Sequence, residues 1–333
     1  MEIFKGKKIL ITGGTGSLGQ ALTKRLLSEG VDVIRIFSRN ENKQVMMEQD
    51  FNDNRLRFLI GDIRDLPRLQ RALEGIDIVF HAAALKHVPV VEYNPFEAIN
   101  TNVFGSQNVI DACLHENVEI AVAVGTDKAV SPLNTYGATK LLMEKLFVTA
   151  SNYLDKKRHK TKFIALRYGN VLGSSGSVIP KFINQIKSNQ KITITDSSMT
   201  RFSITMDEAL DFILESAEIG LGSEVFVPKI RAYSIVDVKD ALIELLGKTE
   251  EEVVGIRPGE KLHEVLINSY EIENTWMVND KYMIVNSLDK EIINKRKYDF
   301  DIVHVKNIKE FSSDNVERIV KDDLKKIIKD NIL

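Results

Sequence analysis

The chain has 333 residues, a formal net charge of −2, 28% charged residues and 44% hydrophobic residues. This composition can fill a large core, which excludes a mainly disordered protein, and the near-zero charge gives no support for a nucleic-acid-binding protein. The single cysteine, Cys113, excludes an intrachain disulfide framework and a cysteine-based zinc site. No apolar run reaches the ~20 residues that span a bilayer, and no signal-peptide pattern precedes the first strand. We therefore expect a cytoplasmic chain without membrane or nucleic-acid partners.

The first half of the chain alternates short apolar runs with helical patterns such as Ser17–Glu29. The predicted strands are Lys8–Thr12, Val33–Phe37, Leu56–Ile60, Ile76–Phe80, Ile120–Val124 and Phe163–Arg167. Strands that alternate with helices pair in parallel, with helices on both faces of the sheet. The pattern predicts an α/β fold with a doubly wound parallel sheet, the Rossmann arrangement.

After about residue 170 this alternation becomes irregular. Gly173–Ser177 has the composition of a loop, Lys191–Ile194 predicts a short strand and Ser234–Leu246 predicts a helix. Apolar residues at helical spacing in Ser313–Leu333 predict a surface helix packed on the body, with a subunit contact as the alternative. We predict a Rossmann domain over residues 1–170 and a smaller substrate-binding lobe over residues 171–333, partly interleaved with it.

A glycine-rich loop, Gly13–Gly19, joins the first predicted strand to the first predicted helix. Glycines allow a tight turn and a close approach of backbone to a pyrophosphate, which the helix N-terminus then faces. The loop therefore predicts a dinucleotide site. Its candidate residues are Gly13, Thr15, Gly16, Ser17, Leu18 and Gly19.

The residues after the second strand indicate which dinucleotide binds. An NAD-preferring site usually has a carboxylate there for the ribose 2′-hydroxyl. This chain has Ser38 and Arg39, with Lys43 nearby, which suit the 2′-phosphate of NADP because arginine makes paired, charge-assisted hydrogen bonds. Glu41 weighs toward NAD, but NADP is the favoured cofactor.

A candidate catalytic group follows the fifth predicted strand. Thr126, Asp127 and Lys128 end that strand, and Tyr136 and Lys140 lie four residues apart in the next helix, on one face. A tyrosine that acts as a base near neutral pH needs its pKa lowered by about three units. No grouping of His, Asp and Glu has metal-ligand spacing, so we expect no metal.

These motifs carry a family resemblance. Gly-x-x-Gly-x-x-Gly followed by Tyr-x-x-x-Lys resembles the extended short-chain dehydrogenase/reductase superfamily, and Thr126–Lys140 resembles the inverting UDP-N-acetylglucosamine 4,6-dehydratases of pseudaminic acid biosynthesis. The resemblance covers about residues 5 to 270. Other matching segments are Ala83–Pro89, Arg167–Gly173, Gly176–Pro180, Met199–Phe202 and Arg257–Glu264. Gly125 departs from the family, which often has serine there.

The resemblance implies further site residues. For the cofactor they are Asp62, Ile63, Ala82, Ala83, Ala84, Lys86, Asn102, Tyr136 and Lys140. For a UDP-sugar they are Lys86, Thr126, Asn170, Val178, Lys181, Thr195, Arg201 and Arg257. His81, at a strand end, is expected to be packed rather than catalytic.

The resemblance also implies a mechanism without net redox change. Tyr136, with its phenolate favoured by Lys140 and the nicotinamide, removes a hydroxyl proton as hydride leaves carbon 4 of the sugar. Lys128 then removes the carbon 5 proton, while a protonated Asp127 donates to the hydroxyl that leaves carbon 6. Hydride returns to carbon 6, and carbon 5 receives a proton on the opposite face. To act as this base, Lys128 needs a lowered pKa. We expect the charge of Lys140 to contribute to that lowering.

Alternative functions stay open. The enzyme alternatives are a UDP-sugar 4-epimerase and a retaining 4,6-dehydratase, and the non-enzyme alternative is an NADP-binding scaffold or redox sensor. The resemblance further implies a homo-oligomer, often a hexamer.

Overall fold

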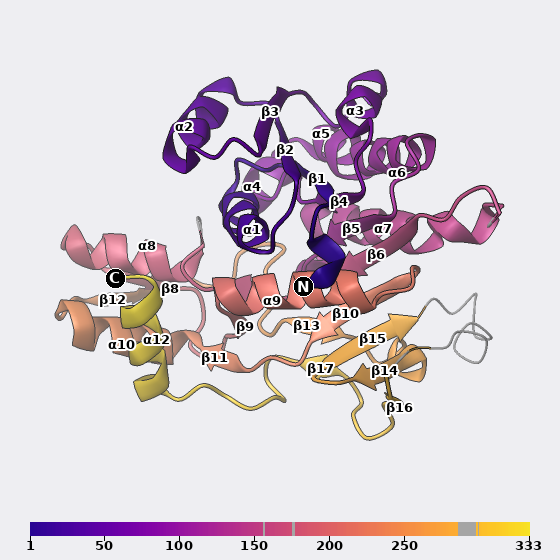
Figure 1. Ribbon diagram of the computed structural model, residues 1–333. Helices are drawn as coiled ribbons and strands as arrows, with labels where there is room; N and C mark the ends of the chain where they lie inside the picture. The colour runs from indigo at the N-terminus through magenta and orange to yellow at the C-terminus, as the bar shows by residue number, and fades with distance from the viewer. Residues whose placement is uncertain (156, 175–176, 286–297, 299) are drawn as a thin grey trace.

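The computed structural model describes residues 1–155, 157–174, 177–285, 298 and 300–333, and its main feature is a ten-stranded sheet (Figure 1). The strand order is β16-β14-β15-β10-β6-β5-β4-β1-β2-β3. The bounds of these strands are β1 Lys8–Thr12, β2 Val33–Ser38, β3 Leu56–Ile60, β4 Ile78–His81, β5 Ile120–Val124, β6 Lys162–Leu166, β10 Glu224–Pro228, β14 Thr275–Val278, β15 Lys281–Val285 and β16 Ile302–His304.

The seven strands from β3 to β10 in this order pair in parallel, which confirms the predicted doubly wound sheet. Strands such as β4 and β5 are buried along their whole length, as expected where helices cover both faces. β15, β14 and β16 are antiparallel additions from the second half of the chain. The two halves are thus interleaved within one sheet.

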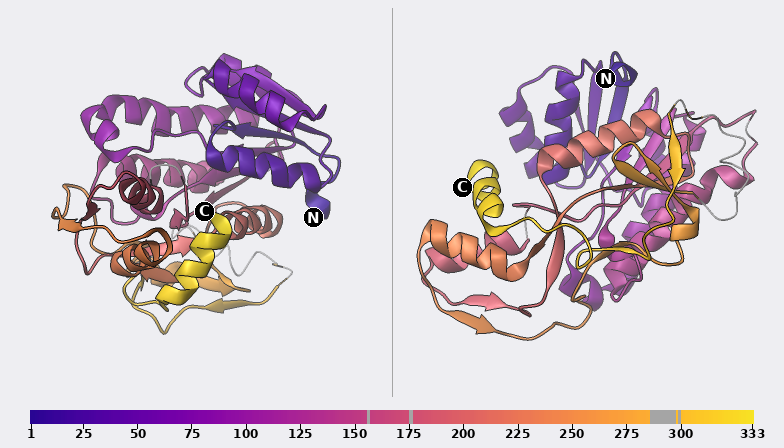
Figure 2. Two further views of the ribbon diagram at one scale, coloured as in Figure 1. Left: turned by 90° about the vertical axis from the view of Figure 1, so that its left-hand side faces the viewer. Right: turned by 90° about the horizontal axis from the view of Figure 1, so that it is seen from below.

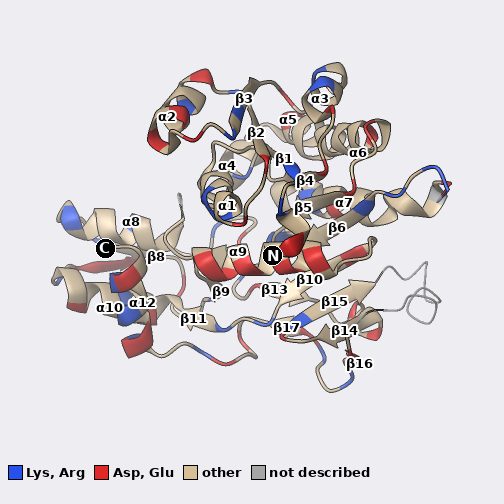
Figure 3. Cartoon of the chain, viewed as in Figure 1, with Lys and Arg blue, Asp and Glu red and all other residues tan. Residues whose placement is uncertain are grey.

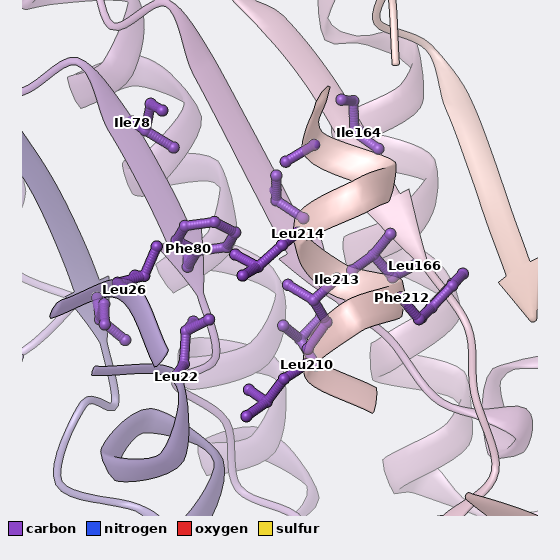
Figure 4. Packing of buried hydrophobic residues seen from close by; sticks show 14 of the residues in the cluster. Leu22, Leu26, Ile78, Phe80, Ile164, Leu166, Leu210, Phe212, Ile213 and Leu214 are labelled. Atoms are coloured by element: carbon purple, nitrogen blue, oxygen red, sulfur yellow. The ribbon is translucent and has the colours of Figure 1, made fainter. Parts of the chain in front are cut away.

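Helices cover both faces of the parallel strands. One face carries α1 (Ser17–Ser28), α2 (Glu41–Phe51) and α9 (Met206–Ile219). The other carries α3 (Leu66–Leu73), α6 (Gly105–His115) and α7 (Thr135–Thr149). Figure 4 shows side chains of α1 and α9 meeting those of β4 and β6 in the first of these cores.

Helices α8 (Val178–Lys187), α10 (Ile235–Leu246) and α12 (Lys321–Asn331) form a separate small core. Figure 2 shows α12 lying beside α10, against which it packs. Short sheets connect this lobe to the main sheet: β11-β9-β7, β12-β8 and β13-β17. Their strands are β7 Asn170–Val171, β8 Ile192–Ile194, β9 Thr200–Ile204, β11 Ala232–Ser234, β12 Glu251–Val253, β13 Val265–Ile267 and β17 Phe311–Ser312.

The remaining elements are short. They are the 3₁₀ helices η1 Glu2–Phe4, η3 Asp127–Ala129, η4 Ala150–Tyr153 and η5 Ile272–Asn274, the π-helix η2 Ile99–Phe104, and the helices α4 Val88–Tyr93 and α5 Pro95–Ala98. Within the described part of the chain, no helix combines the length and apolar character needed to cross a membrane.

The predicted C-terminal helix is correct only from residue 321. Residues 313–320 are not helical, because the Ala232 N–H donates to the Glu317 carbonyl and the Ile319 N–H donates to the Ala232 carbonyl. This segment therefore runs along β11. The surface-helix interpretation is confirmed for α12, whose Leu324 and Ile328 are buried against the lobe.

Charged side chains tie α9 to its neighbours. Figure 3 shows acidic residues gathered along this helix. Asp211 accepts from Arg25 of α1 at 2.6 Å, and Glu215 pairs with Lys281 of β15. Helix α9 thereby links the first βαβ unit to the strands that the second half adds.

Candidate active site

A cavity of about 690 Å³ lies at the carboxyl ends of the parallel strands, over the glycine loop. Gly13 has φ +68° and donates its N–H to the Phe37 carbonyl; an added Cβ would lie 2.9 Å from the backbone of Ala83. No side chain caps the N-terminus of α1, so its first N–H groups are available to an anion. A glycine loop pressed against the backbone of Ala83 and facing a cavity fits a pyrophosphate.

Nearly all predicted cofactor residues line this first cavity, with one exception. Asn102 lies behind it: its side chain accepts from the Leu85 N–H at 2.8 Å and donates to the Leu85 carbonyl and to Thr139. Asn102 thus fixes the 82–87 loop against α7. The lining residues include Gly13, Thr15, Gly16, Ser17, Leu18, Gly19, Ser38, Arg39, Lys43, Asp62, Ile63, Ala82, Ala83, Ala84, Lys86, Tyr136 and Lys140.

His81 has a structural position, as expected. Its ring nitrogens are 2.8 Å from Thr12 Oγ1 and 3.0 Å from Ser106 Oγ, and it is fully buried. Burial, assisted by the charge of Lys140, lowers the pKa of His81 to about 3. The neutral imidazole holds Thr12, whose hydroxyl accepts the Ala83 N–H.

The end of the cavity beyond β2 is basic. Arg39 is 56% exposed on its side chain, with its guanidinium 3.9 Å from the Asp62 carboxylate. Burial opposes ionisation of Asp62, but hydrogen bonds from Arg64 and the charge of Arg39 outweigh it and lower the pKa of Asp62. Ser38 is buried and its hydroxyl accepts from Gln44. Arg39 and Lys43 therefore have donors free to meet a phosphate at this end.

Tyr136 and Lys140 project from the first turns of α7, which Asn134 caps by accepting the Gly137 N–H. Lys140 Nζ donates to the Val124 carbonyl at 2.6 Å and to Met143 Sδ at 3.0 Å. Burial lowers the pKa of Lys140 to about 7, against the opposing charge of Glu144. The amine is thus close to its neutral form at physiological pH.

The expected joint effect of Lys140 and the nicotinamide on Tyr136 stays a prediction, and in the chain alone Lys140 is not among the groups that act on the pKa of Tyr136. Burial raises the pKa of Tyr136, and the cation that opposes this rise is Lys128 rather than Lys140. The physical reason is that Lys140 is directed to the Val124 carbonyl and is only partly charged. In the chain alone, Lys128 and a hydrogen bond with Thr126 oppose the rise in the pKa of Tyr136.

Lys128 lies where the first cavity meets a second, which has a volume of about 630 Å³. Its Nζ is 3.0 Å from Asp127 Oδ1, 3.6 Å from Glu264 Oε1 and 3.5 Å from Asn170 Oδ1. Burial disfavours the ammonium, but Asp127 and Glu264 outweigh it and raise the pKa of Lys128. The expected lowering of this pKa, with a contribution from Lys140, is wrong here because two carboxylates face the amine.

The second cavity gathers most of the predicted substrate residues: Lys86, Asn170, Val178, Lys181, Thr195, Arg201 and Arg257. Thr126 lines only the first cavity. Arg201 is already engaged, since it donates to the carbonyls of Thr200 and Leu262 and to Met199. Gly176, in one of the matching segments, lies outside the described residues.

Sequence reasoning missed two polar residues at this junction. Glu264, 3% exposed, faces both Lys128 and Arg201. Tyr233, 1% exposed, hydrogen-bonds to Asn170, and burial raises its pKa to about 12. Glu264 ends the Arg257–Glu264 segment, which was the available signal. No sequence signal indicated Tyr233, because β11 is brought to the site by its pairing with β9.

Gly125 is explained by close packing. A Cβ at this position would overlap the carbonyl oxygen of Leu166 on the adjacent strand. A serine therefore cannot be placed here without shifting β5 or β6. Among the described residues, no cluster of three or more His, Cys, Asp or Glu side chains could hold a metal ion.

Comparisons with known proteins agree with this geometry. Residues 9–287 match the family described as "Polysaccharide biosynthesis protein". The UDP-N-acetylglucosamine 4,6-dehydratase (inverting) of Campylobacter jejuni is 47% identical over 85% of this chain and 86% of its own. A UDP-glucose 4-epimerase of Rickettsia felis is 41% identical over 95% of this chain and 94% of its own. The crystal structure of Pen from Bacillus thuringiensis superposes with a TM-score of 0.90, at 41% identity, covering 98% of both chains.

Proposed function

Because the chain belongs to the polysaccharide biosynthesis protein family, within the extended short-chain dehydrogenase/reductase superfamily, we propose that it dehydrates UDP-N-acetylglucosamine with inversion at carbon 5. The predicted family and the predicted hydro-lyase class of enzyme are confirmed by these relatives. The product of this reaction is UDP-2-acetamido-2,6-dideoxy-β-L-arabino-hex-4-ulose. In the pathway of the enzymes that the chain resembles, this sugar is the first precursor of pseudaminic acid.

One observation carries the proposal: the Asp127–Lys128 ion pair stands where the two cavities meet. A nicotinamide ring bound in the first cavity supplies reversible hydride transfer at carbon 4 and then carbon 6 of the sugar. Tyr136 and Lys140 line that cavity, and Lys128 lines both the first and the second cavity. A sugar held between them is therefore within reach of a proton acceptor and a proton donor.

The ion pair can supply both proton-transfer groups at once. Transfer of one proton from Lys128 Nζ to Asp127 Oδ1, across 3.0 Å, gives a neutral amine and a neutral carboxylic acid. The amine then removes the carbon 5 proton, and the acid donates to the hydroxyl leaving carbon 6. Substrate binding favours this neutral pair because it displaces water and lowers the local dielectric. The raised pKa of Lys128 in the free chain is therefore compatible with its role as base.

Site variants test these roles. Asp127→Asn and Lys128→Ala should each lower the dehydration rate by about 10²- to 10⁴-fold, the usual contribution of a positioned acid or base. NADP binding by the variants, followed by fluorescence, should be unchanged because neither side chain belongs to the proposed cofactor contacts. Dehydration that survives both substitutions contradicts the proposal.

A UDP-sugar 4-epimerase is the second candidate, favoured by the epimerase name of the Rickettsia relative. Epimerisation needs hydride transfer and a tyrosine base, but no base at carbon 5 and no acid at carbon 6. An epimerase should therefore keep most activity in Asp127→Asn, lose only part of it in Lys128→Ala, because Lys128 favours the Tyr136 phenolate, and lose it in Tyr136→Phe. A retaining dehydratase differs only in the configuration of its product at carbon 5.

The nicotinamide cofactor is proposed to be NADP. Support comes from Arg39 and Lys43, which line the cavity beyond β2 with donors free for a phosphate. The adjacent acid, Asp62, is occupied by Arg64 at 2.8 Å. These residues fit a 2′-phosphate better than they fit a bare ribose hydroxyl.

We also propose that residues 1–170 form the Rossmann domain and residues 171–333 the substrate-binding lobe, and that the chain assembles as a homo-oligomer, of which a hexamer is one form. Residues 1–170 supply most of the first cavity, and residues 171–333 supply most of the second cavity. Large apolar side chains stand exposed on α4, α5, η2 and α7, which pack together: Val90, Tyr93, Phe96, Phe104 and Leu142. Such a patch suits a subunit contact.

The proposed location of the chain is the cytoplasm. A reduced, buried Cys113 suits that compartment.

A further inference from the structure

Lys128 is held between two carboxylates that come from distant parts of the chain. Asp127 precedes it in η3, and Glu264 lies at the end of segment 257–264, just before β13. Both carboxylates are buried, and within the described part of the chain Asp127 Oδ2 and Glu264 Oε2 have no hydrogen-bond partner. The other oxygen of each carboxylate faces Lys128 Nζ, at 3.0 Å for Asp127 and 3.6 Å for Glu264.

Glu264 is itself anchored. Its N–H donates to Ser313 Oγ, and its Oε1 also lies 3.6 Å from Arg201 Nε. Arg201 is fixed by the carbonyls of Thr200 and Leu262. The result is a row of alternating charges, Arg201, Glu264, Lys128 and Asp127, running from β9 to η3.

Segment 257–264 also contacts the backbone that carries Lys128. Asn134 Nδ2 donates to the Gly259 carbonyl at 2.9 Å, and Lys261 Nζ donates to the Val130 carbonyl. These contacts bracket the turn from residue 127 to residue 134. The segment therefore sets where Lys128 lies as well as what charge it faces.

From this geometry we propose that Glu264 is a positioning residue for Lys128: it holds the ammonium at the junction of the two cavities and favours its charged form until substrate binds. The inference rests on the proposed function only for what Lys128 then does. Glu264 lines the second cavity beside Lys128. It acts through Lys128.

Other charged or titratable groups face Lys128 from each neighbouring element. They are Asp127 of η3, Tyr136 of α7, Arg201 of β9, Tyr233 of β11, and Lys261 and Glu264 of segment 257–264. Glu264 and Asp127 are the carboxylates among them. Removing the Glu264 charge takes away an attraction to the Lys128 ammonium and also leaves the repulsion from Arg201 unbalanced. Both effects disfavour the ammonium form of Lys128.

Reductive methylation, followed residue by residue with mass spectrometry, measures this directly. At pH 8.5 Lys128 is mainly charged, so its labelling rate is proportional to its small neutral fraction. Glu264→Gln should raise that rate about tenfold, corresponding to a pKa lower by about one unit. Lys181 lines the same cavity and serves as the standard for reagent access, because Arg257 and Glu260, rather than Glu264, are the charges that act on it.

Two variants provide controls. Glu264→Asp keeps the charge and should keep the labelling rate near that of the natural chain. Glu260→Gln removes a carboxylate that pairs with Arg257 at 3.7 Å and acts on Lys181, so it should change the labelling rate of Lys181 and leave that of Lys128, measured on its own, unchanged. An unchanged Lys128-to-Lys181 ratio in Glu264→Gln overturns the inference, as does an equal rise in Glu264→Asp.

The pH dependence of dehydration separates this inference from the proposed function. If Lys128 is the base, its activity appears as pH rises, and Glu264→Gln should move that rise to lower pH by about one unit. Faster labelling without this movement supports the role of Glu264 and contradicts the role of Lys128 as base.

Discussion

Arg167 and Glu144 form a two-bond ion pair in the core, with both N–O distances at 2.6 Å and each side chain 1% exposed. Glu144 lies one helical turn beyond Lys140 on α7. Arg167 also binds Glu271 and the Leu266 carbonyl, which belong to the second half of the chain. The pair therefore connects α7 to the second half of the chain and balances Glu144, the carboxylate whose charge acts on Lys140.

Arg167→Met should destabilise the protein strongly, because it leaves the buried Glu144 carboxylate without its arginine partner and removes the pairing with the partly buried Glu271. Loss of one member of a buried ion pair costs about 3–5 kcal/mol. Urea unfolding, followed by circular dichroism, measures the difference. The half-exposed pair of Arg25 and Asp211 offers the comparison, and Arg25→Ala should cost at most about 1 kcal/mol. Equal losses in the two variants would show that the buried network contributes no more than a surface pair.

Lys140 should make stability depend on pH. Its pKa is about 7 in the folded chain and 10.5 as the ordinary value, so between these limits the unfolded chain binds more protons. Stability from this group therefore rises with pH from about 7 to about 10. Lys140→Met removes the titration. Its stability relative to the natural chain should be greatest near pH 7 and shrink toward pH 10 in urea titrations; a difference independent of pH would place the pKa of Lys140 at its ordinary value.

Arg39→Ala should weaken NADP binding and leave NAD binding nearly unchanged. One charge-assisted hydrogen bond is worth about 1.5–3 kcal/mol, which corresponds to about a 10- to 100-fold rise in Kd for NADP. Calorimetric titration with both dinucleotides measures the change. Arg57→Ala removes a cation from β3, outside the cavity, and should alter neither affinity. An equal loss for NAD and NADP would contradict a 2′-phosphate contact at Arg39.

Gly125→Ala and Gly125→Ser should be equally destabilising, by about 1–3 kcal/mol, because the overlap with the Leu166 carbonyl comes from Cβ itself. Thermal unfolding of the two variants measures this. A serine that stabilises the protein while alanine does not would indicate that the hydroxyl, rather than the Cβ, decides this position.

The parallel sheet and the dinucleotide cavity could be predicted from the sequence, because local patterns determine both. Buried strands such as Ile120–Val124 and the Gly13–Gly19 loop carry their own signals. Glu264 and Tyr233 could not be assigned a role, since each reaches Lys128 through contacts between segments far apart in the sequence.

The other differences between the sequence-based predictions and the structure also come from contacts between segments that are far apart in the sequence. The sequence predicts a lowered pKa for Lys128 beside a protonated Asp127, whereas in the structure the charges of Asp127 and of Glu264, which is 136 positions away in the sequence, raise it. Likewise, helical spacing of apolar residues over 313–320 is overridden by backbone hydrogen bonds to Ala232. Periodicity reports burial, and the backbone partner decides between helix and extended chain.

Proton NMR of the purified protein with UDP-N-acetylglucosamine in heavy water, without added cofactor, tests the central claim most directly. The proposed mechanism predicts a 4-keto-6-deoxy sugar with inverted configuration and deuterium at carbon 5, formed with a co-purified nicotinamide cofactor that is regenerated in each turnover. A 4-epimer as the sole product would contradict the dehydratase assignment and leave the Asp127–Lys128 pair without a catalytic role.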